Sequence, residues 1–385
     1  MPISVRNLES FGDVAAEDDA VLDYFLTTDA VKRIRENKAF VVLGRKGSGK
    51  TAIVRNFSER SGNPTSRSIS LRGYPWNVHA QRADKGASEI EAYVSTWRYL
   101  IAVEIAQLAL SVIKQPDDSD VKSIEAFLKE NYGSASVDLA KLLQPPKLRL
   151  SKWSFEPTVL GNKLGGISLE RSPQDLGLGL ELNALTNSIL SSVQSLILRY
   201  KIEHLFLHFD ELDQGLLQLD LARRSMLVGL ILAARAIRIE SKGSAALNPV
   251  VYLRSDIWDE LDFSDKNKIT QSNALHLEWT SETLQALVNE RLKVRLDRAV
   301  KWDDIAGPEL LRGGQSKWNH VLARSFLRPR DIISYLNVTL GIAKQRSDEP
   351  LIFQNPDIVN AREPYSDYLK KELDDEILPH WQHWE

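Results

Sequence analysis

Short apolar runs alternate along this chain with longer segments of helical periodicity. Apolar runs bounded by turn residues are typical of buried strands, whereas apolar residues spaced three and four apart indicate helices that bury one face. The strand-like segments are 39–43, 67–71, 205–209 and 250–253. The helix-like segments are 88–112, 121–133, 216–240 and 281–296. This alternation predicts an α/β fold built on a parallel sheet.

The first strand-like segment leads directly into GRKGSGKT, residues 44–51. This spacing is the G-x-x-x-x-G-K-[ST] pattern of a phosphate-binding loop, and the TAIVRNFSER stretch after it suits a helix. Glycines let backbone N–H groups converge on phosphate oxygens, and a helix N-terminus adds its positive end. Lys50 would reach the β- and γ-phosphates, and Thr51 would ligate Mg²⁺. The expected nucleotide-binding residues are Gly44, Arg45, Lys46, Gly47, Ser48, Gly49, Lys50, Thr51 and Ala52.

An acidic pair follows the apolar run 205–209. Asp210 and Glu211 stand at the carboxyl end of this expected strand, which in α/β sheets is the end that faces the ligand. Asp210 would hold the Mg²⁺ ion through water, and Glu211 would act as general base toward the attacking water. The plainer alternative is a strand that ends in an acidic turn. We interpret Asp213 as the N-cap of the next helix and His208 as a packed or hydrogen-bonded residue.

Two arginines are candidates for contact with the γ-phosphate. Arg254 directly follows the apolar run 250–253, whose end would lie beside the acidic pair in the sheet. Arg330 follows Pro329 at the start of an amphipathic helix, where proline is favoured, and could swing from there onto the nucleotide. The alternatives are a surface ion pair for Arg254 and a solvent-facing basic turn for Arg330. The expected catalytic residues are Lys50, Glu211, Arg254 and Arg330; the expected metal-binding residues are Thr51 and Asp210.

Composition narrows the class of protein. The chain has 385 residues, a net charge of −3 and an isoelectric point of about 6.2. Its overall charge therefore does not support binding to nucleic acid, and a local basic patch is the alternative that this leaves open. It contains no cysteine, which excludes disulfides, thiolate metal sites and cysteine nucleophiles. No apolar run approaches the roughly 20 residues that cross a bilayer. Because the N-terminus also lacks a signal-peptide pattern, we expect a cytoplasmic protein without a membrane segment.

The motifs together resemble those of a known family. GRKGSGKT, LFLHFDELD, VVYLRSD and RPRD are similar to Walker A, Walker B, sensor 1 and sensor 2 of AAA+ and STAND-type ATPases. The resemblance is closer to bacterial ATPases of the Orc/Cdc6-like neighbourhood, over about residues 20–345 without the middle insertion. It implies a three-layer P-loop NTPase core that binds ATP and Mg²⁺ and hydrolyses ATP as a molecular switch. It also implies a homo-oligomer or a separate effector protein as partner, and an association with anti-phage defence.

These motifs also set the expected domain organisation. Two parts of the ATPase core flank an insertion between Walker A and Walker B, and a small helical lid and an acidic tail follow. The core occupies residues 1–115 and 201–300, the insertion 116–200, the lid 301–346 and the tail 347–385.

The insertion carries an alternating apolar pattern around GNKLGG, which predicts a β-hairpin or a pair of extended strands. The apolar side chains of Leu148, Leu150, Trp153 and Phe155 would pack on the chain's own helices or form a surface for a partner. Lysines and arginines close by leave contact with nucleic acid open as well.

Two departures from the family pattern bear on the mechanism. Lys50 and Asp210 are farther apart in the sequence than is usual in AAA+ ATPases. In addition, the stretch 262–279, where such ATPases often carry an arginine finger, contains no arginine; Lys266 and Lys268 are its lysines. The alternative function is therefore a nucleotide-binding oligomeric scaffold with little or no hydrolysis of its own. A small-molecule kinase would need an acceptor site, and none is visible in the sequence.

Overall fold

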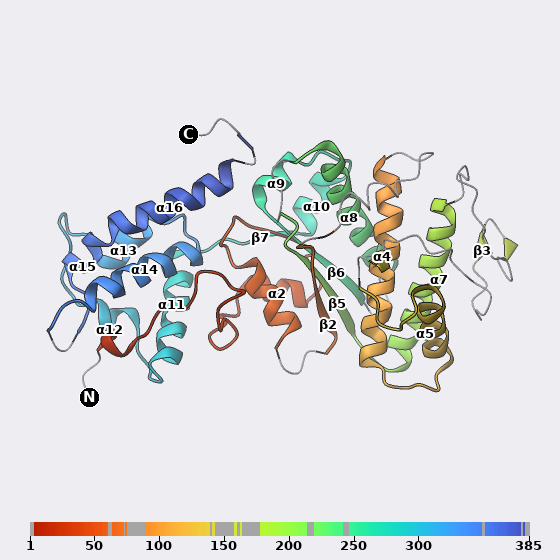
Figure 1. The fold of residues 1–385 in the computed structure, drawn as a ribbon, viewed down its shortest axis with the longest axis horizontal. Helices are drawn as coiled ribbons and strands as arrows, with labels where there is room; N and C mark the ends of the chain where they lie inside the picture. Colours follow the sequence, from red (N-terminus) through yellow and green to blue (C-terminus); the bar gives the residue numbers. More distant parts are fainter. Residues whose placement is uncertain are drawn as a thin grey trace.

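The computed structural model describes most of the chain. The described residues are 4–60, 64–72, 74, 89–138, 141–142, 158–159, 162–163, 178–213, 219–241, 246–348, 351–378 and 380–381. They form an elongated molecule in which a helical region, a sheet and a further group of helices follow one another along the long axis (Figure 1). Within these ranges, none of the helices combines the length and the apolar character that crossing a membrane requires.

A five-stranded sheet occupies the middle of the molecule. Its strands, in spatial order, are β2 (Ser66–Ser70), β5 (His204–Asp210), β6 (Ala246–Leu253), β1 (Val41–Leu43) and β7 (Ala274–His276). Each strand runs parallel to its neighbours. In this register Leu43 lies opposite both Leu253 and His276, and Asp210 lies opposite Ser70. The carboxyl ends of the strands therefore meet at one edge, which brings the segments after them together.

Helices cover both faces of the sheet (Figure 1). On one face lie α1 (Asp29–Arg35) and α2 (Lys50–Ser58), and on the other α4 (Glu89–Val112) and α8 (Leu221–Glu240). Successive side chains of a strand point to opposite faces. In β5, Leu207 and Phe209 accordingly join the core on the α4 and α8 side, whereas Phe206 packs against Phe57 of α2. The short helices α9 (Ser255–Glu260) and α10 (Lys266–Ser272) connect β6 to β7.

The α/β class and the parallel sheet expected from the sequence are confirmed. β5 ends at Asp210, and β6 ends one residue before Arg254, so both lie at the carboxyl edge of the sheet. His208 is fully buried, with its ring nitrogens 2.9 Å from the Tyr252 hydroxyl and 3.0 Å from Ser66 Oγ. Burial lowers the pKa of His208 to about 3. It is therefore a neutral, hydrogen-bonded core residue, as the sequence predicts.

The insertion adds a helical layer beyond α4. It contains α5 (Ser119–Tyr132) and α7 (Leu178–Arg199), and α4 packs against both α7 and α8. Around GNKLGG, β3 (Thr158–Val159) and β4 (Asn162–Lys163) form the expected antiparallel pair. The apolar positions considered as a packing or partner surface, Leu148, Leu150, Trp153 and Phe155, lie outside the described residues.

The other end of the molecule is a helical lobe. It consists of α11 (Ser281–Arg295), α12 (Trp302–Ala306), α13 (Lys317–Leu322), α14 (Pro329–Ala343), α15 (Asn355–Asn360) and α16 (Arg362–Ile377). Its apolar core also contains residues from the beginning of the chain, next to the 3₁₀ turn η1 (Val5–Asn7). Val5 and Leu8 are fully buried there, and Phe11 stacks on Phe353 with ring centroids 6.2 Å apart.

This lobe is larger than the lid expected at residues 301–346. α11 precedes these bounds, and α15 and α16 follow them. The described part of 347–385 is therefore not an appended acidic tail, because Leu351, Phe353 and Tyr365 are buried in the core of the same lobe. The acidic surface of α16 hid its buried residue, Tyr365, from the sequence pattern.

Candidate functional site

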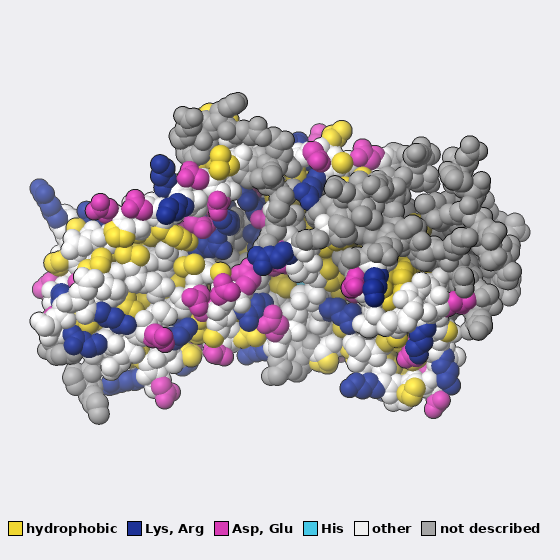
Figure 2. Space-filling model, viewed as in Figure 1, with side chains coloured by type: hydrophobic (Ala, Val, Ile, Leu, Met, Phe, Trp, Pro, Cys, Tyr) yellow, Lys and Arg dark blue, Asp and Glu magenta, His cyan; other side chains and the backbone are white. Residues whose placement is uncertain are grey.

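A cavity of about 1180 Å³ lies at the carboxyl edge of the sheet, somewhat above the roughly 300–1,000 Å³ of typical ligand pockets. Its walls come from residues 46–53, from the segments that follow β5 and β6, from residues of the stretch 13–33, and from the helical lobe. Acidic and basic side chains mix on the surface where the helical lobe meets the sheet (Figure 2). Because residues of both parts line it, the cavity lies between the helical lobe and the sheet with its covering helices, which we call the sheet lobe.

The glycine loop, residues 44–51, has a shape that requires its glycines. Gly47 and Gly49 have φ values of 78° and 97°, in the left-handed region that strains any other residue. A Cβ on Gly47 would also lie 2.7 Å from the Cβ of Arg330, so the loop and α14 approach more closely than a larger residue would allow. A Cβ on Gly44 would lie 2.4 Å from Ser48 Oγ. The loop is thus shaped for close approach of its backbone to other groups.

Two polar side chains of the loop differ in what they can reach. The Nζ atom of Lys50 donates hydrogen bonds to the carbonyl oxygens of Gly44 at 2.9 Å and Arg45 at 3.2 Å. The Ser48 hydroxyl is buried beside Gly44 and has no hydrogen-bond partner among the described residues. Buried polar atoms normally find a partner, so a small shift of the loop would satisfy this hydroxyl. The loop therefore offers the ammonium of Lys50 to an anion.

Asp210 and Thr51 meet beside Lys50. The Asp210 carboxylate is buried and accepts hydrogen bonds from the Thr51 side chain and from the backbone N–H of Glu211. Burial raises the pKa of Asp210 to about 6, although these bonds and Lys50 act in the opposite direction. Burial likewise lowers the pKa of Lys50, against the carboxylates of Asp213 and Asp210. Opposite charges lie close together here with little solvation. A bound ion would therefore strongly shift the pKa of both groups.

Glu211 follows Asp210 with a positive φ of 60° and lines the cavity. Its carboxylate accepts a hydrogen bond from the hydroxyl of Ser70 and lies 3.9 Å from Nε of Arg72. Ser70 is the last residue of β2 and pairs with Asp210 in the sheet. The end of a neighbouring strand therefore orients the carboxylate.

Arg254 lies at the cavity wall, and only 7% of it is exposed. Its Nε atom donates to Asp256 Oδ1 at 3.0 Å, and its Nη1 atom lies 3.7 Å from Asp213 Oδ2. The expectation that Asp213 caps the next helix is wrong. Asp220 caps α8, accepting a hydrogen bond from the backbone N–H of Arg223 at 2.7 Å. Asp213 instead belongs to the cavity, through its ion pair with Arg254.

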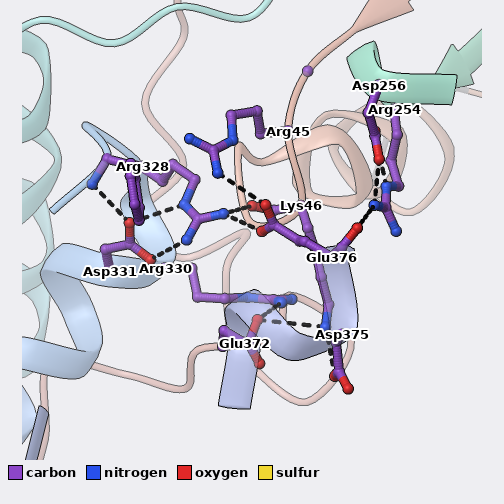
Figure 3. A network of polar contacts seen from close by, with 12 residues as sticks. Arg45, Lys46, Arg254, Asp256, Arg328, Arg330, Asp331, Glu372, Asp375 and Glu376 are labelled. Carbon is purple, nitrogen blue, oxygen red and sulfur yellow. Dashed lines mark hydrogen bonds and ion pairs between the residues drawn. The ribbon is translucent and has the colours of Figure 1, made fainter. Parts of the chain in front are cut away.

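Arg330 reaches the glycine loop from the helical lobe (Figure 3). Its backbone N–H donates to the Gly47 carbonyl at 3.4 Å, and its Nη1 atom lies 2.9 Å from Glu372 Oε2. Arg328, two residues earlier, is buried and pairs with Asp331, with 2.8 Å between Nε and Oδ2. Arg330 therefore lines the cavity, while Arg328 fixes the start of α14.

Residues 282–374 match the family model described as a FunZ-associated C-terminal helical domain. The matched residues make up about a quarter of the chain and run from α11 into α16, so the match describes the helical lobe and not the sheet. No curated protein matches the chain.

The helical lobe also supplies contacts that no sequence motif marks. Trp279, just before α11, donates its Nε1–H to the Ser48 carbonyl at 2.9 Å. Arg291 of α11 forms an ion pair with Asp19, with 2.8 Å between Nη2 and Oδ2, and both residues are almost fully buried. Its Nη1 atom also donates to the Phe11 carbonyl at 2.6 Å. These partners are too distant in sequence for any local pattern to reveal them.

The lysines of the stretch 262–279 contact nearby parts of their own chain. Lys266 donates its Nζ hydrogens to the Leu261 carbonyl at 2.6 Å and the Asp259 carbonyl at 3.2 Å. Lys268 pairs with Asp265 at 2.7 Å, and its side chain is 73% exposed. Of the two, Lys268 is the one whose exposure would let it reach a neighbouring molecule.

The residues around the cavity fit a phosphate ligand with a divalent cation. Among the described residues, no three His, Cys, Asp or Glu side chains group as a ready-made metal site. Mg²⁺ usually takes one or two protein ligands and completes its shell with water and phosphate oxygens. Thr51 and Asp210 match such a set, since both line the cavity and the Thr51 side chain interacts with the Asp210 carboxylate.

Proposed function

We propose that the protein is a P-loop ATPase that binds ATP with Mg²⁺ and hydrolyses it as a molecular switch. The observation that carries this proposal is the meeting of Lys50, Thr51 and Asp210 at the carboxyl edge of a parallel sheet. P-loop NTPases use an ammonium and a hydroxyl of the loop, with a carboxylate from a neighbouring strand, to hold the phosphates and Mg²⁺. The resemblance of the surrounding motifs to those of AAA+ and STAND-type ATPases supports ATP as the nucleotide.

Binding would use the glycine loop and the first turn of α2. Backbone N–H groups between Arg45 and Ala52 would donate to the phosphates, and the N-terminus of α2 would add its positive end. Lys50 would exchange its bonds to the loop carbonyls for bonds to phosphate oxygens. Thr51 and Asp210 would hold Mg²⁺, which when bound neutralises charge on the phosphate oxygens.

Hydrolysis would depend on Glu211. Its carboxylate would take a proton from water as the water oxygen bonds to the γ-phosphorus and the bond to the bridging oxygen of ADP breaks. Arg254 and Arg330 would stabilise the charge that develops on the γ-phosphate. Glu211 would first have to exchange the Ser70 hydroxyl for the attacking water.

One observation favours a second candidate, a nucleotide-binding oligomeric scaffold with little or no hydrolysis. The Glu211 carboxylate already accepts a hydrogen bond from Ser70 and lies near Arg72. The Ser70 hydroxyl occupies one of the carboxylate oxygens to which the attacking water would otherwise bind. Such a scaffold would bind ATP through the same loop but release almost no phosphate.

The two candidates separate in one experiment. ATP binding and phosphate release are measured for the wild type and for Lys50→Ala over a range of protein concentrations. Both activities should require Lys50 in an ATPase, whereas a scaffold should show Lys50-dependent binding without turnover. Binding and turnover that survive Lys50→Ala would contradict both candidates. A steep rise of turnover with protein concentration would support a homo-oligomer.

The proposed switch would act on a partner through the helical lobe, because Arg330 connects that lobe to the glycine loop. A separate effector protein and a part in anti-phage defence are what the resemblance suggests for this switch. Adding DNA to the same assays tests the contact with nucleic acid that the sequence leaves open, since such contact should raise turnover.

A further inference from the structure

The acidic end of α16 covers the basic side of the glycine loop (Figure 3). The Oε2 atom of Glu376 lies 2.9 Å from Nη2 of Arg45. The Nζ atom of Lys46 lies 3.0 Å from Asp375 Oδ2 and 3.4 Å from Glu372 Oε2. Glu372 and Glu376 are four residues apart on a helix, so their side chains point the same way. We call Glu372, Asp375 and Glu376 the acidic clasp.

The acidic clasp also holds arginines that come from outside the loop. Glu372 pairs with Arg330 at 2.9 Å, and Glu376 pairs with Arg328. The backbone carbonyl of Glu376 accepts a hydrogen bond from Arg254 Nη2 at 3.4 Å. The side chains of Glu372 and Glu376 are only 17% and 11% exposed, so solvent and salt screen these pairs weakly. The clasp therefore engages Arg330, which the proposed function assigns to the γ-phosphate, and the backbone of Glu376 binds Arg254, which has the same assignment.

The two ends of α16 are attached differently. Near its start, Tyr365 is buried in the lobe, with its ring centroid 4.8 Å from that of Tyr335. Its last turns meet the loop through the ion pairs of the clasp, and just beyond them His380 contacts Asp256 at 2.7 Å and Glu260 of α9. The start of α16 is thus held by apolar packing, whereas its end is held mainly by polar contacts, which a competing anion could replace.

We propose that the acidic clasp is an internal competitor of the nucleotide's phosphates and restrains nucleotide binding. This inference rests on the proposed function. Carboxylate and phosphate seek the same guanidinium and ammonium donors, and two anions side by side repel each other. Because binding equilibria are reciprocal, a clasp that weakens nucleotide binding is itself loosened by the nucleotide by the same factor. Nucleotide binding would thereby release the end of α16 to a partner.

The test compares two double variants that change the net charge equally. Glu372→Gln with Glu376→Gln neutralises the two least exposed carboxylates of the clasp, whereas Glu363→Gln with Asp367→Asn neutralises exposed residues nearer the start of the same helix. Equilibrium binding of a slowly hydrolysed, radiolabelled ATP analogue with Mg²⁺ is measured for both, for the wild type and for Lys50→Ala. Circular dichroism first establishes that each variant is folded.

We expect the clasp variant to bind the analogue roughly 5- to 150-fold more tightly than the wild type, the usual range of coupling between sites. The control variant should bind like the wild type. Equal binding by the clasp variant and the control, with Lys50-dependent binding in the wild type, would overturn the clasp and leave the proposed function standing. Absence of binding in every protein, the clasp variant included, would overturn both.

A second measurement needs no variant. Hydrogen exchange of the wild-type backbone amides is followed with and without the same ATP analogue and Mg²⁺. Saturating analogue should speed exchange in residues 372–378 and leave residues 362–368 unchanged, since only the end of α16 would be released. Unchanged or slower exchange in residues 372–378 at saturation would overturn the clasp.

Discussion

The two lobes contribute to the cavity in different ways. On the sheet side, the polar groups stand directly after strands: the glycine loop after β1, and Asp210 and Glu211 at the end of β5. On the helical side, Trp279, Arg291 and Arg330 come from separate places and contact residues distant in sequence. Chemistry on the sheet side is therefore encoded locally, whereas the helical side exists only once the lobe has packed. Substitutions on the two sides should fail in correspondingly different ways.

The largest effect should come from a sheet-side change that leaves packing intact. Glu211→Gln keeps the size of the side chain and can still accept a hydrogen bond from Ser70, but it cannot take a proton from water. We expect phosphate release to fall about 10²–10⁴-fold while nucleotide affinity is retained. Glu363→Gln, the same chemical change at an exposed position, is the control. Unchanged turnover in Glu211→Gln would remove Glu211 as the base.

On the helical side, the corresponding change should act on stability. Arg291→Met leaves the buried Asp19 carboxylate without its closest ion-pair partner, and breaking such a pair typically lowers the free energy of unfolding by about 3–5 kcal/mol. Arg295→Met is the control, because Arg295 lies 3.7 Å from Asp19 and is partly exposed, which predicts a loss below about 1 kcal/mol. Urea unfolding measures both. Equal losses would show that the buried pair contributes no more to stability than the partly exposed one.

A change at Asp210 should separate stability from function on the sheet side. Its pKa of about 6 is above the ordinary 3.8, so the folded protein binds this proton more tightly than the unfolded chain does. The ionised carboxylate therefore lowers stability above pH 6, by about 3 kcal/mol, and this loss disappears below about pH 4. Asp210→Asn should be more stable than the wild type at pH 8, but not at pH 4, in thermal unfolding without ligand.

Magnesium-dependent nucleotide binding should be lost in the same Asp210→Asn protein, because the carboxylate is an expected metal ligand. A stability difference that is the same at pH 8 and pH 4 would contradict the assigned cause, which is the burial of an ionised group.

The smallest effect should come from the single hydrogen bond between the helical side and the loop. Trp279→Phe keeps an aromatic ring but removes the donor to the Ser48 carbonyl. A hydrogen bond of this kind contributes about 1 kcal/mol, so we expect nucleotide affinity to fall about fivefold. Trp318→Phe is the matched control, since its Nε1–H donates to Ser281 Oγ within the helical lobe. It should lower stability without changing affinity. Equal affinities in the two variants would mean that Trp279 does not support the loop.

The sequence predicted the sheet side well for a physical reason. A strand, a glycine turn and a helix start are neighbours in the chain. A local sequence pattern is therefore enough to find GRKGSGKT and the acids after 205–209. The role of Asp213 cannot be read from the sequence because it depends on Arg254, which directly follows another strand. The ion pair of Asp19 with Arg291 cannot be read from a local sequence pattern either, because the two residues are far apart in the chain. The acidic surface of α16 resembles a solvated tail until Tyr365 and the loop cations are seen beside it.

The burial of Val5, Leu8 and Phe11 in the helical lobe has a mechanical consequence. The chain leaves that lobe through residues 12–28, builds the sheet, and returns through residues 277–280, so the lobes are joined by two covalent connections. A single linker would let one lobe rotate in any direction relative to the other. Two separated linkers instead define one axis of rotation. Opening of the cavity should therefore follow one preferred direction. A fragment cut at residue 282 would lose that axis together with part of its own apolar core.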